Sequence, residues 1–378
     1  MNVSVVGAAT TKFGELWGVS PRTLAHEAVE GALADADIAK SNVQALFVAN
    51  MLAGPLGGQQ HLGPFFAEEL GLPVPAMTIE GACASGGLAV HAAVNSIRSG
   101  QYDTVVVLGV EKMTDHKPED VATALMGAGS NEERLAGATF PGLYAILARA
   151  HMEKFGTTFE ELATVAVKNH FHASLNTNAQ FHNTLTVEDV MKSSKIADPL
   201  TLLECSPISD GASAVVLTKN HKGIRIIASE VATDTIGLAQ RESLLEFEAT
   251  KEAARRAYQK AGVTSKEIDV AEVHDCFTIA EILAMEDLGF FPKGKAAAVI
   301  VRGETTLGKT KKLVVNPSGG LKGCGHPVGA TGVKQIVEIV QQLRGTAGKR
   351  QVAKARIGLA HNVGGSGATA VVHILKNI

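Results

Sequence analysis

The chain has 378 residues, of which 46% are hydrophobic and 19% are charged, and its formal net charge is -3 at pH 7. These values are typical of a globular protein with one large or two medium domains, and they give no basis for nucleic acid or an anionic membrane as a partner. No apolar window approaches the roughly 18 residues of a membrane span, and the N-terminus lacks the basic leader of a signal or transit peptide, so we expect a cytoplasmic protein.

The first third of the chain alternates between strands and helices. Apolar segments of strand length and segments with helical periodicity follow one another over Met1–Thr11, Leu24–Ala36, Val43–Ala49, Val74–Ile79, Leu88–Ile97 and Thr104–Gly109. Such alternation predicts an α/β fold with largely buried sheets.

A turn of small residues, Gly-Ala-Cys-Ala-Ser-Gly-Gly over 81–87, carries Cys83 from a strand into a helix. Small neighbours leave the sulfur accessible, and the N-terminus of the helix offers N–H groups and a dipole that favour thiolate over thiol. Cys83 is therefore a candidate nucleophile. The alternative is a small buried hydrophobic residue, which is the usual place of a free cysteine.

The stretch Thr114–Leu200 differs from what precedes it, with glycine-broken segments and two helical runs at Ala145–Phe155 and Phe159–Ser174. We expect a loop domain over 114–200 that covers the active site. Residues 1–113 with 201–220 then form an N-terminal half, and residues 221–378 form a C-terminal half.

Three segments recur in the same order in the two halves. Leu46–Val48 matches Ala271–Val273, Gly87–Gly100 matches Gly332–Gly345, and Asp210–Leu217 matches Ser366–His373, at offsets of 225, 245 and 156 residues. The drop in the last offset corresponds to about 89 additional residues in the first half, which fits the loop domain. Self-similarity of this kind predicts a duplicated fold with two sheets facing each other across shared helices.

A second constellation follows the strand expected at Ile268–Val273, where the chain reads His-Asp-Cys-Phe over 274–277 before the next helix. His274 and Cys276, two residues apart at the end of a strand, can both project into one cleft. The alternative is local packing, with Asp275 or Thr278 capping the helix.

A glycine-rich loop, Asn316–Gly332, contains Gly-His-Pro-Val-Gly-Ala-Thr-Gly over 325–332 and precedes a helix expected at Val333–Leu343. His326 lies two residues from the position that the repeat pairs with Cys83. Its place at an equivalent helix start makes it a catalytic candidate, although a single loop histidine is more often only hydrogen-bonded.

The last constellation, His-Asn-Val-Gly-Gly-Ser-Gly over 361–367, lies between strands expected at Ile357–Ala360 and Ala368–Leu375. Adjacent glycines can turn a backbone N–H into a cleft, as an oxyanion hole requires. The alternative is a plain glycine-rich hairpin.

Together these four motifs resemble those of the thiolase superfamily, and most closely the sterol-carrier-protein-type and archaeal and bacterial thiolases. The resemblance implies a duplicated fold of five αβαβα layers, a homodimer or homotetramer, and coenzyme A or acyl-CoA as substrate with no permanently bound cofactor. Degradative thiolases have Asn-Glu-Ala-Phe where this chain has residues 274–277, and a cysteine where it has Asn362. The resemblance therefore gives the acid/base role to Cys276.

The resemblance also implies the other roles. Cys83 attacks the ketone of a 3-ketoacyl thioester while His326 takes its proton, and the N–H groups of Cys83 and Gly364 stabilise the oxyanion. His326 and His274 stabilise the enolate of acetyl-CoA, and Cys276 protonates its carbon. In reverse, the same site condenses acyl-CoA with acetyl-CoA.

Rival interpretations remain open at the level of sequence. A β-ketoacyl synthase acting on carrier-protein thioesters would use Cys83, His274 and His326 and would not need Cys276. A non-catalytic acyl-CoA-binding subunit is a second rival, and the aldolase-like branch of the superfamily, which lacks the nucleophilic cysteine, is a third. A second protein that channels the product is an expected type of partner.

Other reactive side chains are expected to be structural. His170, His172 and His182 have no tight spacing with carboxylates, so we expect a helix surface or a pantetheine channel and no metal. Cys324 is expected to be buried and inert, and Cys205 to pack near the exit of the loop domain. Lys309–Lys312 reads as a solvated turn.

Overall fold

The computed structural model describes residues 2–221, 223–310 and 312–378. Among these residues, ten strands are joined in the order β10-β9-β11-β12-β8-β1-β7-β4-β2-β3. The strands of the first half are β1 (Val3–Thr10), β2 (Ala45–Ala49), β3 (Ala76–Ile79), β4 (Thr104–Glu111) and β7 (Gly211–Lys219). Those of the second half are β8 (Ile224–Thr233), β9 (Val270–Glu272), β10 (Val314–Val315), β11 (Ile357–Gly364) and β12 (Thr369–Asn377).

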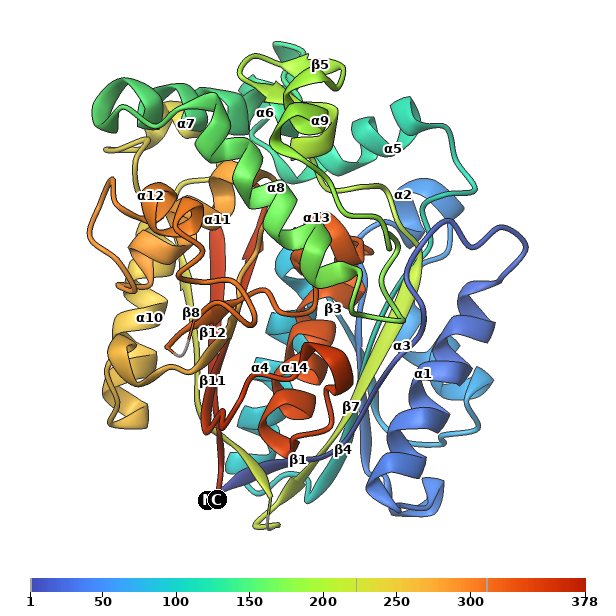
Figure 1. The fold of residues 1–378 in the computed structure, drawn as a ribbon. Coiled ribbons are helices and arrows are strands. Elements are labelled where there is room, and N and C mark those ends of the chain that lie inside the picture. Colours follow the sequence, from blue (N-terminus) through green and yellow to red (C-terminus); the bar gives the residue numbers. More distant parts are fainter. Residues whose placement is uncertain (1, 222, 311) are drawn as a thin grey trace.

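The two halves have the same topology. In each, the third strand of the half lies at the edge, followed by the second, the fourth, the fifth and the first. The two first strands, β1 and β8, join the halves through only three residue pairs, Val3 with Ile226, Ser4 with Arg225, and Val5 with Ile224. The sheets therefore meet at one end of the molecule and diverge toward the other (Figure 1). The predicted duplication is confirmed.

Four helices complete a five-layer arrangement (Figure 1). Helix α1 (Pro21–Ala36) covers the outer face of the first sheet, and α10 (Glu248–Ala261) covers the outer face of the second. Helices α4 (Ser85–Arg98) and α14 (Val328–Arg344) pack against each other between the two sheets. This is the αβαβα order that the resemblance implied, so the predicted fold class is confirmed.

Glycines allow α4 and α14 to approach closely. A Cβ added at Gly332 would lie 2.2 Å from the backbone nitrogen of Gly87, and one added at Gly86 would lie 2.8 Å from that of Gly332. No side chain fits between backbones at this separation. Gly86, Gly87 and Gly332, at the ends of the cysteine and histidine motifs, thus allow the N-terminal parts of α4 and α14 to pack together.

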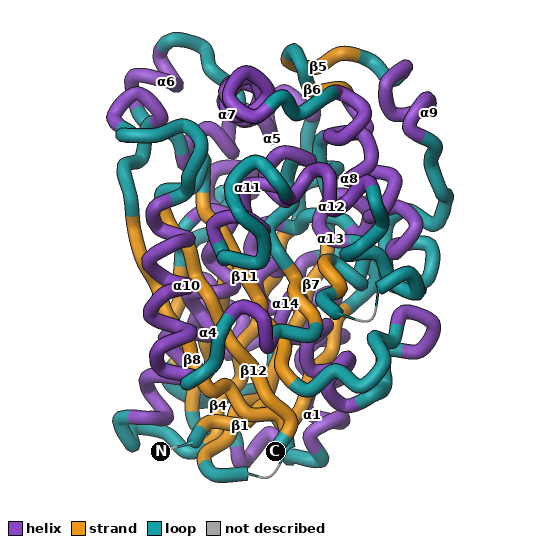
Figure 2. The backbone as a smooth tube through the Cα atoms, turned by 60° about the vertical axis from the view of Figure 1, so that its left-hand side comes forward, coloured by secondary structure: helices purple, strands orange, loops and turns teal. Residues whose placement is uncertain are grey.

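The remaining elements lie mainly over the divergent end of the sheets (Figures 1 and 2). They are α2 (Ala53–Gly57), α3 (Leu62–Glu69), α5 (Pro118–Leu125), α6 (Asn131–Leu135), α7 (Phe140–Phe155), α8 (Phe159–Ala173), α9 (Val187–Lys192), β5 (Lys195–Ala197), β6 (Leu200–Thr201), α11 (Thr278–Asp287), α12 (Ala296–Val301) and α13 (Gly320–Cys324). Helix α7 begins earlier than predicted because Thr139 caps it and Pro141 occupies its first turn. The division into domains at 113, 200 and 220 stays a prediction.

Within the described ranges, no helix combines the length and the apolar composition that are needed to cross a bilayer.

Candidate active site

Three of the predicted site residues lie immediately before helices. Cys83 belongs to a single 3-10 turn, Ala82–Ala84, in front of α4. Cys276 comes two residues before α11, and His326 two residues before α14. Ala82 has a φ of 55°, an uncommon value for a residue other than glycine, which makes the turn before α4 sharp.

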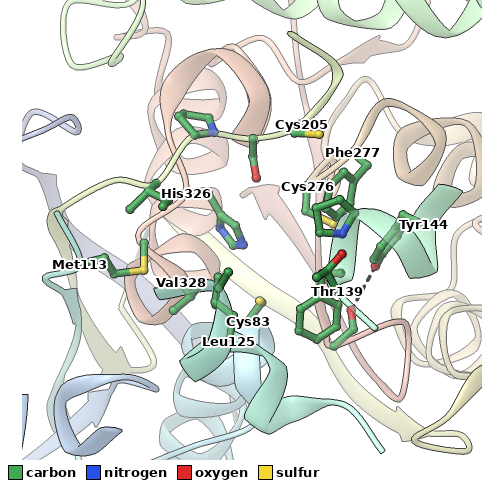
Figure 3. Close-up of a pocket in the computed structure, with 17 residues that line it drawn as sticks. Cys83, Met113, Leu125, Thr139, Tyr144, Cys205, Cys276, Phe277, His326 and Val328 are labelled. Atoms are coloured by element: carbon green, nitrogen blue, oxygen red, sulfur yellow. Dashed lines mark hydrogen bonds between the residues drawn. The ribbon is translucent and has the colours of Figure 1, made fainter. Parts of the chain in front are cut away.

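These residues border one cavity of about 200 Å³ (Figure 3). Cys83, Cys276 and His326 face it, and most of the other lining side chains are apolar. The lining includes Met113, Ala122, Leu125, Thr139, Phe140, Pro141, Tyr144, Cys205, Ser206, Pro207, Ile208, Phe277, Val328 and Gly365. Residues from α5 and α7 form part of this wall, so the segment 114–200 contributes directly to the cavity.

The geometry brings Cys83 together with both predicted histidines. The sulfur of Cys83 and one ring nitrogen each of His274 and His326 lie within 4.8 Å of one another. The two imidazole rings meet edge to face, with centroids 5.2 Å apart. Proton transfer and oxyanion stabilisation both require groups at such short range.

Burial raises the pKa of the Cys83 thiol to about 12, against a smaller lowering by hydrogen bonds from the backbone N–H groups of Gly365 and of Cys83 itself. The charge of Glu111 raises the pKa further. The effect of burial on the pKa thus outweighs the lowering that was expected from the N–H groups at the start of α4. The amide against the sulfur is that of Gly365, one residue beyond the predicted Gly364.

His326 is a neutral base in this environment. Burial, together with the charge of Lys334, lowers its pKa to about 3. The Thr331 hydroxyl lies 3.0 Å from the Pro327 carbonyl, to which it donates, and 2.7 Å from Nδ1 of His326. Because the hydroxyl hydrogen is already used, Nδ1–H of His326 donates to Thr331 and Nε2 keeps a free lone pair.

His274 has the opposite tautomer, and Asn362 sets it. The Asn362 oxygen accepts the N–H of Gly87 at 3.0 Å, so the amide nitrogen of Asn362 must face the other way. That nitrogen donates to the carbonyl of Cys83 at 2.9 Å and to Nδ1 of His274 at 3.2 Å. The hydrogen of His274 is then on Nε2, which is buried and has no hydrogen-bond partner among the described residues. His274 lies behind the residues that line the cavity and is not one of them.

Cys276 is also held as a thiol. Burial raises its pKa well above the ordinary value, while the neighbouring Tyr144 hydroxyl and the N–H of Phe277 lower it. Tyr144 was not singled out from the sequence. It lies on α7, and its hydroxyl donates to the carbonyl of Gly365 at 3.1 Å (Figure 3).

Asp275 connects the second motif to the third. It does not cap α11, whose N-cap is Phe277 without a side-chain hydrogen bond. Its carboxylate instead accepts the N–H groups of Leu321 at 2.6 Å and Lys322 at 3.2 Å. These residues are in α13, so Asp275 fixes the loop that presents His326.

The other predicted side chains divide into three groups. Cys205 lines the cavity, whereas Cys324 is buried outside it. His170 and His172 are buried and not on a helix surface as predicted, because they hydrogen-bond to backbone atoms in the interior, while His182 is exposed. Lys309 and Lys312 are exposed, as a solvated turn requires, and Lys311 lies outside the described residues.

Comparison with known proteins agrees with this geometry. Residues 3–221 match the family described as Thiolase, N-terminal domain, and residues 231–377 match Thiolase C-terminal domain-like. The acetyl-CoA acetyltransferase of Methanothermobacter thermautotrophicus is 48% identical over 99% of each chain. Sterol carrier protein 2 of Homo sapiens is 37% identical over 98% of this chain and 71% of its own.

Two solved structures have the same fold. One, described as an Ltp2-ChsH2(DUF35) aldolase, has a TM-score of 0.84 at 25% identity and covers 99% of this chain and 97% of its own. The acetyl-CoA acetyltransferase from Syntrophomonas wolfei has a TM-score of 0.76 at 20% identity and covers 100% of this chain and 99% of its own. With both halves matched by family and by fold, this protein belongs to the thiolase family.

Proposed function

We propose that this protein is a coenzyme A-dependent thiolase that cleaves 3-ketoacyl-CoA, or condenses acyl-CoA with acetyl-CoA, through an acyl group on Cys83. The observation that carries the proposal is that two histidines in opposite tautomers lie beside the sulfur of Cys83. His326 offers a lone pair and His274 offers a hydrogen, and atoms of both lie within 4.8 Å of the sulfur. A base on one side and an oxyanion donor on the other are what acyl transfer to a thiol requires.

In the first step the sulfur of Cys83 attacks the 3-keto carbon, and Nε2 of His326 takes the thiol proton. Backbone N–H groups of Cys83 and of Gly364 or Gly365 donate to the oxyanion. The bond between the α and β carbons then breaks. Its electron pair forms the enolate of acetyl-CoA, whose thioester oxygen accepts from Nε2–H of His274 and from protonated His326.

Cys276 completes the turnover by moving protons. Its thiol gives a proton to the α carbon of the enolate, which releases acetyl-CoA and leaves a thiolate. That thiolate takes the proton of incoming coenzyme A, and the coenzyme A sulfur attacks the acyl group on Cys83. The Cys83 sulfur leaves and takes its proton back from His326, which restores both residues. The cycle consumes no redox equivalent.

The rivals are less well supported. A carrier-protein synthase does not require a thiol at position 276. A non-catalytic subunit does not require His274 and His326 to be held in opposite tautomers. One structural relative is described as an aldolase, but this chain has a cysteine at 83. The atoms of Cys83, His274 and His326 are close enough to share a metal ion. Nε2 of His274 carries a hydrogen in the tautomer that we infer from Asn362, however, so we propose chemistry without a metal.

We further propose that coenzyme A thioesters bind as substrates and not as a resident cofactor, with residues 114–200 helping to hold them. A cytoplasmic location and a homodimer or homotetramer belong to the same proposal. A second protein that receives the product is an additional proposal, and it draws support from the structural relative whose description pairs Ltp2 with ChsH2(DUF35).

The acyl-enzyme is the direct test. Brief incubation with a 3-ketoacyl-CoA in the absence of free coenzyme A, followed by peptide mass mapping, is expected to locate the acyl group on Cys83. An acyl group on Cys205, Cys276 or Cys324 would overturn the assignment. Thiolysis rates with acetoacetyl-CoA and with longer 3-ketoacyl-CoA substrates then define the chain length.

Cys276→Ser separates thiolase from synthase. A hydroxyl has a far higher pKa than a thiol, so we expect turnover to fall about 10²–10⁴-fold. Acylation of Cys83 should continue, because that step uses His326. Wild-type thiolysis in this variant would make Cys276 a packing residue and favour the synthase.

A further inference from the structure

We propose that the hydroxyl of Tyr144 alternates between two acceptors, the carbonyl of Gly365 and the sulfur of Cys276, and stabilises the Cys276 thiolate each time the thiol gives up its proton. The inference rests on the proposed function and deepens it, because it assigns a catalytic role to a residue outside the four motifs.

The ring of Tyr144 is fixed in place. It is buried, stacks on Phe277 with centroids 4.6 Å apart, and meets Phe247 edge to face at 6.3 Å. Contacts on two sides leave the ring little room to move. The hydroxyl hydrogen can still rotate about the C–O bond, since hydroxyl hydrogens turn to suit their acceptors.

The hydroxyl oxygen has two neighbours that accept hydrogen bonds. The Gly365 carbonyl lies 3.1 Å away, and the sulfur of Cys276, which borders the same cavity, interacts with the hydroxyl. A neutral thiol is a weak acceptor, so in the resting site the single hydrogen goes to Gly365. A thiolate is charged, and charge-assisted hydrogen bonds are roughly twice as strong as neutral ones. The hydrogen therefore turns to the sulfur once Cys276 is deprotonated.

The site offers the thiolate little other help. Burial strongly disfavours a charge at Cys276, and the remaining donor is the N–H of Phe277. The nearby sulfur of Cys83 and the carboxyl of Asp275 also disfavour it. Without the Tyr144 hydroxyl, the anion formed after enolate protonation would have one donor in an apolar cavity.

Tyr144 keeps its own proton throughout. Burial raises its pKa well above the ordinary value, so it is a donor and neither an acid nor a base. The S–H bond of Cys276 breaks as the α C–H bond of acetyl-CoA forms, and the S–H bond re-forms with the proton of coenzyme A. Because the N–H of Gly365 contacts Cys83, the same glycine connects Tyr144 to Cys83.

The test compares Tyr144→Phe with Tyr258→Phe. Tyr258 is the matched control, because its hydroxyl also donates to a carbonyl, that of Leu288 at 2.9 Å, on a helix away from the cavity. Tyr144→Phe should lower steady-state thiolysis about 10- to 100-fold, the range for a hydrogen bond to a charged group. Acylation of Cys83 should stay within about twofold of wild type, and Tyr258→Phe should change neither rate.

A second measurement reads the thiolate directly. In a Cys83→Ala background, the alkylation rate of Cys276 by iodoacetamide follows its thiolate fraction. Adding Tyr144→Phe should slow it about tenfold and leave the rate at Cys205, in the same cavity, unchanged. Equal losses in acylation and thiolysis with unchanged alkylation of Cys276 would mean a structural role and overturn the proposal. Absence of any acyl-enzyme in the wild type would instead overturn the proposed function.

A probe that leaves position 144 as tyrosine covers the case in which Tyr144→Phe does not fold. The chain has three tyrosines, so biosynthetic replacement by meta-fluorotyrosine gives three fluorine NMR signals. The Tyr144 signal should shift when Cys276 is alkylated, and the Tyr258 signal should not. An unmoved Tyr144 signal would contradict a direct contact.

Discussion

At the scale of single residues, burial disfavours charge on Cys83 and on His326. Burial raises the pKa of Cys83 to about 12 and lowers that of His326 to about 3. Both shifts oppose a thiolate–imidazolium pair, so charge has to appear only as the reaction proceeds. The unreacted site therefore avoids the free-energy cost of desolvating a buried thiolate–imidazolium pair.

We therefore predict the pH profile of alkylation at Cys83. Thiolate appears only as the pH rises toward about 12, and His326 becomes charged only near pH 3. The rate with iodoacetamide should thus rise about tenfold per unit from about pH 7 to about pH 10. Mass spectrometry of the Cys83 peptide measures it. A plateau through neutral pH would mean that a resting ion pair exists.

Asn362→Asp tests how the tautomer of His274 is set. A carboxylate cannot donate to Nδ1 of His274, so it should draw the hydrogen there and leave Nε2 without a proton. Loss of one oxyanion donor costs about 10²–10³ in kcat. Asn95→Asp is the control, because Asn95 donates to His91 in a similar pair at the surface. Equal turnover in the two variants would contradict the role of Asn362.

Sequence motifs brought out the candidate residues because each lies shortly before a helix. Atoms of Cys83, His274 and His326 lie within 4.8 Å of one another, and Cys276 borders the same cavity as Cys83 and His326. Their chemical roles stay predictions. Tyr144 escaped notice because its helix begins with Phe-Pro-Gly, which has no helical periodicity, and its partner Cys276 is in the other half. The tautomer of His274 could not be predicted either, because it depends on a hydrogen bond from Asn362, which is far away in the chain.

At the scale of elements, the contact between α4 and α14 positions Cys83, the proposed nucleophile, near His326, its proposed base. Cys83 precedes α4 and His326 precedes α14, so the separation of these two helix starts sets the distance of proton transfer. The repeat predicted that the two helices are equivalent. It gave no information on how closely they pack, because an alignment carries no distances.

Gly332→Ala should disrupt this contact. Its Cβ would meet backbone atoms of α4 at 2.2 Å, and overpacking of a core costs about 1–3 kcal/mol, with the upper end expected against rigid backbone. We expect a lower melting temperature and at least a tenfold loss of acylation. Gly57→Ala is the control, since nothing lies within 4 Å of its added Cβ. Unchanged acylation in Gly332→Ala would show that the helices can part without harm.

At the scale of the whole molecule, the duplicated halves form the frame and the segment 114–200 closes the site. α5 and α7 contribute Leu125 and Tyr144 to the cavity, so ligand binding should order this segment. Hydrogen exchange with and without coenzyme A is expected to show increased protection within 114–200. Protection confined to the sheets would contradict a role for this segment in binding.

The junction between β1 and β8 can act as a hinge, because only three residue pairs join the two sheets there. Cys83 belongs to the first half of the chain, and His274, Cys276 and His326 belong to the second half. A small rotation of one half about this hinge becomes a larger displacement at the far end of the sheets, where proton transfer tolerates little change in distance. Substitutions in these three residue pairs should therefore lower the rate of acylation at temperatures where the protein is still folded.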